Sequence, residues 1–255
     1  MYIATPPASH LELALMVAAA GKPCCVEKPI AVNHAEADHM LRAFSDADLP
    51  LFVAYYRRSL PRFESVRAWL TREAIGTVRH VHWSLTRRPS ASDLRGDLGW
   101  RVDPRQAPGG YFDDLAVHGL DLFVHFFGPI ADVSGFTSRQ AGLYPAPDAV
   151  AACWRHESGI TGSGHWNFAA GELVDEVRIS GSHGHIEFSI LAEAPLLLSS
   201  PEGVQSHTIP HPEFIQEPHI AAMVKHLTGG VAHPSTGESA ARTARVCDRI
   251  LALQY

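Results

Sequence analysis

The stretch CCVEKPIAV, residues 24–32, decides how the rest of the chain is interpreted. Residues 24–26 are short and apolar, as in a buried strand, and Pro29 cannot continue a strand ladder because it lacks an N–H. Glu27 and Lys28 therefore follow directly on the end of a strand. Ligands of open α/β sheets bind beyond the carboxyl ends of the strands, so these two charged residues are candidate site residues. A solvated ion pair at a strand end is the simpler alternative.

Helices and strands alternate around this stretch. A strand that ends before Thr5 is followed by a predicted helix over 9–21, in which Ser9 and Glu12 have the spacing of a capping box. A second capped helix, 33–44, leads to an apolar strand at 51–56. This order is typical of a parallel βαβαβ sheet.

The pattern changes after Tyr56. A helix over 61–76 is followed by seven short, β-rich segments, which one long helix over 110–127 interrupts, and two helices over 212–230 and 236–253 close the chain. The short links between the β-rich segments favour antiparallel neighbours. The sequence therefore predicts an α/β protein with a parallel sheet first and antiparallel strands beyond it.

Composition excludes several classes of partner. The 255 residues include 27 acidic and 21 basic side chains, for a net charge of −6, so we expect no nucleic-acid partner. No apolar run is long enough to span a bilayer, and the start has no secretory signal pattern, so we expect no membrane partner. The four cysteines form no C-x-x-C pair, which favours a reduced, cytoplasmic protein.

The predicted helix over 110–127 has a polar face on an otherwise apolar surface. Asp114, His118, Asp121 and His125 are four, three and four residues apart, which places them within an arc of roughly 60°. Each Asp could simply pair with the His four residues on, as a structural seam. The functional interpretation is a histidine that moves a proton and is oriented by a carboxylate. A metal hydrolase built on the first three residues lacks further ligands, so no metal is expected.

Four motifs occur here in the order found in one family. YIATPPASH, GKPCCVEKPIAV, WRVDPRQAPGGYFDDLAVHGLDLF and FFGPI resemble the Gfo/Idh/MocA oxidoreductases, the relatives of glucose–fructose oxidoreductase and inositol dehydrogenase. The E-K-P and G-G-x-x-x-D-x-x-x-H motifs are specific when they occur together. The resemblance runs from residue 2 to the C-terminus. It implies a partial Rossmann domain over 1–56 and a substrate and oligomerisation domain over 57–255. The second domain would hold a large open, mostly antiparallel sheet, and its last helix would pack back on the first domain.

The resemblance also implies an activity, which is reversible hydride transfer between NAD or NADP and a sugar, polyol or related hydroxyl or carbonyl compound. Lys28 would bind the reacting oxygen and assist proton transfer, His118 would be the acid or base, and Asp114 would orient the substrate or the imidazole. Tyr56, where relatives commonly have Asn, would contact the substrate or the cofactor. A homo-oligomer would form through the open sheet. The residues along the nicotinamide side of the cofactor would be Thr5, Pro6, His10, Glu27, Lys28, Trp100 and Arg101.

The sequence departs from the family in one respect. The G-x-G-x-x-G loop that holds the pyrophosphate is absent, and so is the acidic residue that follows it in dinucleotide-binding folds. The chain opens at what resembles the fourth Rossmann strand. We expect a misplaced start or an incomplete gene, with a genuine fragment as the alternative, and in either case weak NAD(P) binding by this chain alone. The alternative function is a truncated, non-catalytic relative that serves as an oligomer partner or ligand-binding module. Lys28, Asp114 and His118 together argue against this alternative, because such a module needs no proton-transfer residues.

Overall fold

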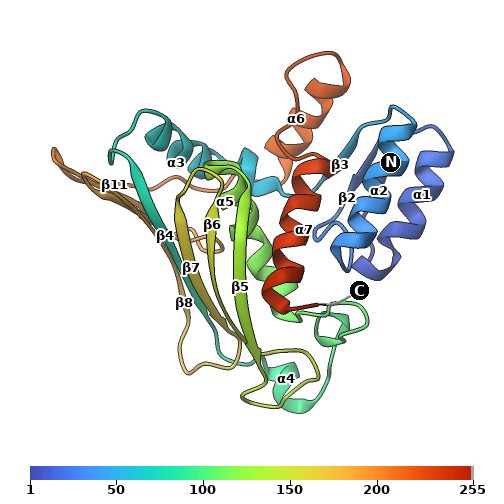
Figure 1. Cartoon of the computed structure of the whole chain (residues 1–255), viewed down its shortest axis with the longest axis horizontal. Coiled ribbons are helices and arrows are strands. Elements are labelled where there is room, and N and C mark those ends of the chain that lie inside the picture. The colour runs from blue at the N-terminus through green and yellow to red at the C-terminus, as the bar shows by residue number, and fades with distance from the viewer. Residues whose placement is uncertain (254–255) are drawn as a thin grey trace.

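The strands form two separate sheets in the computed structural model, which describes residues 1–253 (Figure 1). The last two residues of the expected second domain, 254 and 255, lie outside the described residues. The strands are β1 Tyr2–Ile3, β2 Cys24–Val26, β3 Leu51–Val53, β4 Val78–Thr86, β5 Ile130–Ser138, β6 Ala149–His156, β7 Thr161–Asn167, β8 Val174–Gly181, β9 His185–Phe188, β10 Leu196–Ser200 and β11 Gly203–His207. The α-helices are α1 His10–Ala19, α2 His34–Asp46, α3 Pro61–Thr71, α4 Ala91–Arg95, α5 Val117–Phe127, α6 Glu217–Leu227 and α7 Gly237–Leu251.

The small sheet has the parallel order β1-β2-β3 that the alternation of strands and helices predicts. Asn33 caps α2, because its side chain accepts a hydrogen bond from the Glu36 N–H at 2.8 Å. The capping box predicted at Ser9 is wrong. The prolines before it tighten the chain into a 3₁₀ turn, Pro7–Ser9, and the Ser9 hydroxyl donates to Thr5 Oγ1 instead of capping α1.

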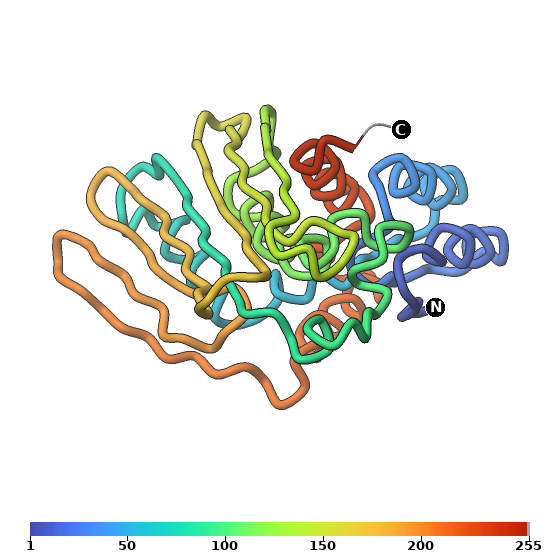
Figure 2. Tube along the Cα trace, turned by 90° about the horizontal axis from the view of Figure 1, so that it is seen from below, coloured from blue at the N-terminus to red at the C-terminus, as the bar shows by residue number. Residues whose placement is uncertain are grey.

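The large sheet has the order β11-β10-β9-β8-β4-β7-β6-β5, and every neighbouring pair is antiparallel except β4 and β7. The hairpin of β10 and β11 lies at the end of the sheet far from the small sheet, as Figure 2 shows. Side chains alternate between the two faces, so that Trp83 and Trp166 lie in the core while His82 and His165 point outward. Helices α3, α5 and α7 lie on the core-facing side of this sheet (Figures 1 and 2).

Helix α5 packs closely on the inner face of the large sheet. A Cβ on Gly119 would lie 2.4 Å from the Trp83 ring, so glycine allows this close approach. The predicted helix over 110–127 is present but not uniform, because Phe112–Ala116 form a π-helical turn before α5 begins. Such turns occur often at functional sites.

Helix α7 lies between the two sheets and contacts α2, α5 and the edge strand β5 (Figure 1). The C-terminal helix therefore joins the small sheet to the large one. The α/β architecture with a partial Rossmann sheet and a large, mostly antiparallel sheet is confirmed. Within residues 1–253, no helix combines the length and the apolar character that crossing a membrane requires.

Candidate active site

The loops that follow β1, β2 and β3 meet at one edge of the small sheet, because the three strands are parallel. His10 holds two of these loops together. Its Nε2 lies 2.8 Å from the carbonyl oxygen of Thr5, and its Nδ1 lies 3.1 Å from that of Pro29. The His10 side chain is fully buried. It therefore adds no surface of its own to the cofactor side and acts by positioning the loops.

Lys28 projects from the loop after β2 onto the π-helical turn. Its Nζ donates to Asp114 Oδ1 at 2.7 Å and to the Asp114 main-chain oxygen at 2.6 Å. Arg101 Nε donates to the other oxygen of the same carboxylate at 2.9 Å. Burial opposes ionisation of Asp114, but the two cations outweigh it and hold the pKa of this carboxyl below its usual value. Two residues that the sequence singled out 86 positions apart thus form one ion pair.

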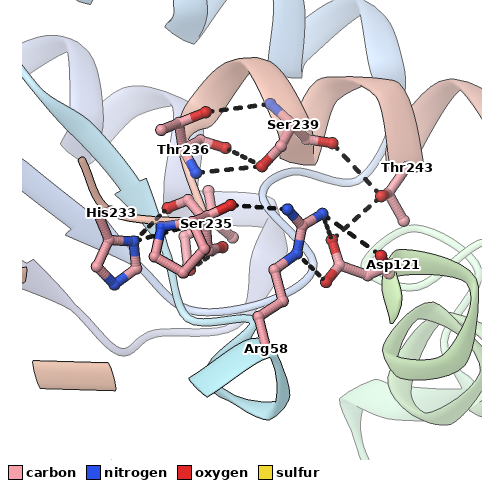
Figure 3. Close-up of polar contacts among 9 residues, drawn as sticks. Arg58, Asp121, His233, Ser235, Thr236, Ser239 and Thr243 are labelled. Carbon is pink, nitrogen blue, oxygen red and sulfur yellow. Dashed lines mark hydrogen bonds and ion pairs between the residues drawn. The ribbon is translucent and has the colours of Figure 1, made fainter. Parts of the chain in front are cut away.

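The self-paired polar seam is wrong, because neither Asp114 nor Asp121 pairs with the His four residues on. Asp114 binds Lys28, and Asp121 forms a two-pronged ion pair with Arg58 (Figure 3). In that pair, Arg58 Nε donates to Asp121 Oδ2 at 2.7 Å and Nη2 donates to Oδ1 at 2.6 Å. Thr243 of α7 adds a hydroxyl at 3.3 Å. The second Asp is therefore a structural anchor.

His118 is buried beside this arrangement, with 5% of its surface exposed. Its Nδ1 has no hydrogen-bond partner among the described residues. The Tyr56 and His118 rings pack edge to face, with their centres 5.7 Å apart. Burial, together with the charges of Arg57 and Lys28, holds the pKa of His118 well below its usual value. The ring is therefore neutral near pH 7, the state in which one imidazole nitrogen has a free lone pair.

The remaining candidate residues form a more open surface beside Lys28. Thr5, Pro6 and Arg101 are exposed, and the Arg101 guanidinium lies 4.5 Å from the centre of the half-buried Trp100 ring. Glu27 accepts hydrogen bonds from the Tyr2 hydroxyl and from the Gln216 amide. These side chains, together with the unpartnered Nδ1 of the buried histidine, fit the nicotinamide half of a dinucleotide at the strand ends.

Sequence reasoning missed three residues of this region. Arg57 and Arg58 belong to none of the motifs singled out in the sequence, although their position just after β3 puts them at the same edge as Lys28. Their position after a predicted strand was the signal by which the sequence could have marked them as site residues. Gln216 lies in the segment before α6, and no motif marks it.

The metal-hydrolase alternative is not supported, because the two carboxylates it would use, Asp114 and Asp121, are both paired with cationic side chains. Over the described range 1–253, no group of three His, Cys, Asp or Glu side chains could hold a metal ion.

Two family models match the chain. One is described as an oxidoreductase family with an NAD-binding Rossmann fold and matches residues 1–55. The other is the GFO/IDH/MocA C-terminal domain and matches residues 63–187. The two matches fall on the small sheet and on most of the large one.

Individual proteins are similar over longer spans. Oxidoreductase P35 of Formosa agariphila is 30% identical over 249 residues, which cover 97% of this chain and 77% of that protein. D-apiose dehydrogenase of Paraburkholderia graminis is 30% identical over 82% of this chain, which spans 55% of that relative. A solved NAD-binding oxidoreductase from Klebsiella pneumoniae superposes with a TM-score of 0.86 at 20% identity, over 98% of this chain and 76% of that one.

Proposed function

The chain belongs to the Gfo/Idh/MocA family of NAD(P)-dependent oxidoreductases, and on that basis we propose that it interconverts a hydroxyl and a carbonyl group of a sugar or polyol. The observation that carries the proposal is the ion pair of Lys28 and Asp114 beside a buried, neutral His118. An alcohol oxidation needs a proton acceptor at the hydroxyl, and this arrangement supplies two groups able to move that proton.

Each side chain of the site has a separate role in this proposal. NAD(P), when bound, supplies the hydride acceptor or donor. Lys28 binds the reacting oxygen and stabilises the charge that develops on it. His118 takes the hydroxyl proton, and its unpartnered Nδ1 leaves the ring free of competing hydrogen bonds at that atom. Asp114 holds Lys28 in place through two contacts, so that the ammonium group does not have to be ordered during the reaction.

The cofactor and substrate contacts extend this proposal. Thr5, Pro6 and Glu27 would line the nicotinamide side together with Lys28, supported by their position just beyond β1 and β2. Trp100 and Arg101 would join them from the 3₁₀ turn Trp100–Val102, because Arg101 binds the Asp114 carboxylate that also holds Lys28. His10 would contribute by fixing two of the loops. Tyr56 would contact the substrate, because its ring lies against His118. The choice between NAD and NADP depends on residues outside this set.

The substrate class comes from relatives. Curated proteins similar to this chain include a D-apiose dehydrogenase, a levoglucosan dehydrogenase and a myo-inositol 2-dehydrogenase. Their names share a cyclic or branched polyhydroxy compound as substrate. We therefore propose a polyhydroxy alcohol for this protein as well.

We also propose that copies of the chain associate through the outer face of the large sheet. Among residues 1–253, no helix covers this face (Figure 1). Phe136 of β5 is 79% exposed. Sedimentation velocity tests the idea: Phe136→Asp should shift the protein toward the monomer. Phe214→Asp, at another exposed aromatic residue in the segment before α6, should not. Identical sedimentation of the two variants would reject the sheet interface.

The free state of all four cysteines supports a reducing, cytoplasmic location. Fractionation of the native cells tests this, since recovery outside the cytoplasmic fraction would contradict it.

The activity is tested with Lys28→Ala in the full-length protein. We expect turnover of a polyol substrate, followed by NADH absorbance, to fall at least 1,000-fold, on the order of what loss of both charge stabilisation and proton transfer removes. NAD(P) binding, measured by calorimetry, should remain. Lys22→Ala is the matched control, because Lys22 is exposed on the same domain. Unchanged turnover in Lys28→Ala would reject the catalytic role of Lys28 and favour the non-catalytic alternative.

A further inference from the structure

Arg57 is a buried arginine without an anionic partner in hydrogen-bond contact. Only 6% of its surface is exposed, and its Nε and Nη1 are buried without hydrogen-bond partners among the described residues. Its neighbour Arg58 is as deeply buried but is saturated by Asp121 and by the Pro234 carbonyl. A buried cation is expensive unless an opposite charge or a full set of acceptors compensates it. Arg57 therefore has an unmet requirement for an acceptor.

The surrounding groups do not meet that requirement. Asp175 is the acidic residue whose charge acts on Arg57, but its oxygens already accept from the Trp83 indole and from three main-chain N–H groups. Arg62, also buried, gives its Nη groups to main-chain carbonyls and adds a second positive charge nearby. His211 is also influenced by both arginines, and its Nε2 is likewise buried without a partner. Glu193 pairs with His211 at 2.9 Å and also acts on Arg62, so the region holds two arginines and two carboxylates, Asp175 and Glu193. What it has in excess is buried nitrogen atoms without hydrogen-bond partners among the described residues, two of them on Arg57.

This region adjoins the reacting groups. Arg57 lies on the turn after β3, and its guanidinium is 5.1 Å from the centre of the Tyr56 ring. The centre of the same Tyr56 ring lies 5.7 Å from the centre of the His118 imidazole, in an edge-to-face arrangement. A substrate whose hydroxyl reaches His118 and Lys28 would therefore place its next substituents beside Tyr56, within reach of Arg57.

We propose that Arg57 binds a carboxylate of the substrate, so that the polyhydroxy substrate is a sugar acid, such as an aldonate or a uronate. This inference rests on the proposed function of the same site. A guanidinium presents a planar pair of N–H donors that matches a carboxylate, and one buried cation balances one negative charge. A phosphate dianion would leave one charge uncompensated. The carboxylate is not altered in the reaction: the C–H bond of the CH–OH carbon breaks, its electron pair goes to the oxidised nicotinamide, and the hydroxyl proton goes to the protein.

The test compares matched pairs of substrates in the full-length protein. D-glucuronate is compared with D-glucose and with glucose 6-phosphate, and D-galacturonate with D-galactose, by kcat/KM with NAD(P). We expect the acid of at least one pair to be preferred on the order of 100-fold, as one charge-assisted hydrogen-bonded pair provides. Arg57→Met should reduce this preference to roughly threefold or less, and Arg57→Lys should keep part of it, because it retains the charge but not the fork. Arg67→Met, at an exposed arginine, is the control that should keep both activity and preference.

Calorimetric titration of the same uronates without cofactor provides a readout that is independent of turnover. Uronate binding that is lost in Arg57→Met while Arg67→Met retains it would support the proposal, even if no sugar were oxidised and the proposed activity failed. Turnover with equal or better kcat/KM for the neutral sugars, or a preference for the phosphate ester, would overturn the proposal and leave the activity standing. If Arg57→Met does not fold, Arg57→Lys and the wild-type preference decide in the same way.

Discussion

Replacement of Arg58 by methionine should destabilise the protein strongly, because it leaves the Asp121 carboxylate buried without its cation. Arg58 and Asp121 are 4% and 1% exposed, and the pair carries two hydrogen bonds. The Thr243 hydroxyl at 3.3 Å would remain as the one side-chain partner of the acid within the described residues (Figure 3). The Pro234 carbonyl would also lose its donor. The segments held by this cluster are the turn after β3, α5, and the start of α7, so its loss weakens the junction between the two sheets.

The expected cost follows from the burial of the pair. Removing one partner of a buried ion pair costs about 3–5 kcal/mol, whereas an exposed pair contributes about 0–1 kcal/mol. For a chain of this size, each kcal/mol shifts the Tm by roughly 2–4 °C. Arg58→Met should therefore lower the Tm by roughly 6–20 °C.

Urea unfolding followed by far-ultraviolet circular dichroism, together with thermal scans, measures this cost. Arg67→Met is the matched control, because Arg67 forms an exposed pair with Glu64 three residues before it. It should cost less than about 1 kcal/mol. Adding Asp121→Leu to Arg58→Met should recover part of the loss, since the orphaned charge is then gone. If Arg58→Met costs no more than Arg67→Met, the argument that this buried pair anchors the junction is wrong.

Three further predictions concern the site and its support. Asp114→Asn should reduce kcat on the order of 100-fold, because the lysine that Asp114 orients is misplaced. It should lower the Tm by less than Arg58→Met does, because Lys28 and Asp114 are more exposed than Arg58 and Asp121. An unaltered kcat would contradict the orienting role. Burial and two nearby cations depress the pKa of His118, so the unfolded chain takes up this proton first as the pH falls below about 6.5. The stability advantage of wild type over His118→Asn, measured by urea unfolding, should then shrink by at most about 1.4 kcal/mol for each pH unit. A constant difference in stability would refute this. Gly119→Ala should cost about 1–3 kcal/mol in the same assay, because the new methyl group meets the buried Trp83 ring; equal stability to Gly171→Ala, which enters open space, would contradict this packing.

The fold was predictable because local signals and the tertiary arrangement agree. The apolar strand before Glu27, the Asn33 cap and the alternation of helices and strands all recur in the structure. The Ser9 cap failed for a local reason. Capping-box spacing concerns only two residues, three positions apart. Pro6 and Pro7 upstream fix the backbone in a turn that directs the Ser9 hydroxyl back toward Thr5.

An ion pair of the site was predictable only where sequence motifs contained both of its residues. Lys28 and Asp114 were each singled out, and the structure brings them together. The helix periodicity alone predicted the wrong pairs, because i,i+4 spacing shows which side chains share a face and not which charges arrive from elsewhere in the fold. Lys28 and Arg58 come from the strand-end loops, and each outcompetes an imidazole for its carboxylate.

The two adjacent arginines show where sequence reasoning ends. Both lie on the 3₁₀ turn Tyr56–Ser59, in which successive side chains point about 120° apart. Arg58 consequently reaches the junction of α5 and α7 and is neutralised there. Arg57 instead lies beside the Tyr56 ring and, within the described residues, forms no ion pair, although the charge of Asp175 acts on it. Nothing in the dipeptide distinguishes the anchor from the unpaired cation, because the distinction depends on which acid the fold brings to each side. An arginine that the fold buries without a partner, next to a proton-transfer group, is best explained by a partner that arrives with the substrate, and the comparison of sugar acids with neutral sugars tests that explanation directly.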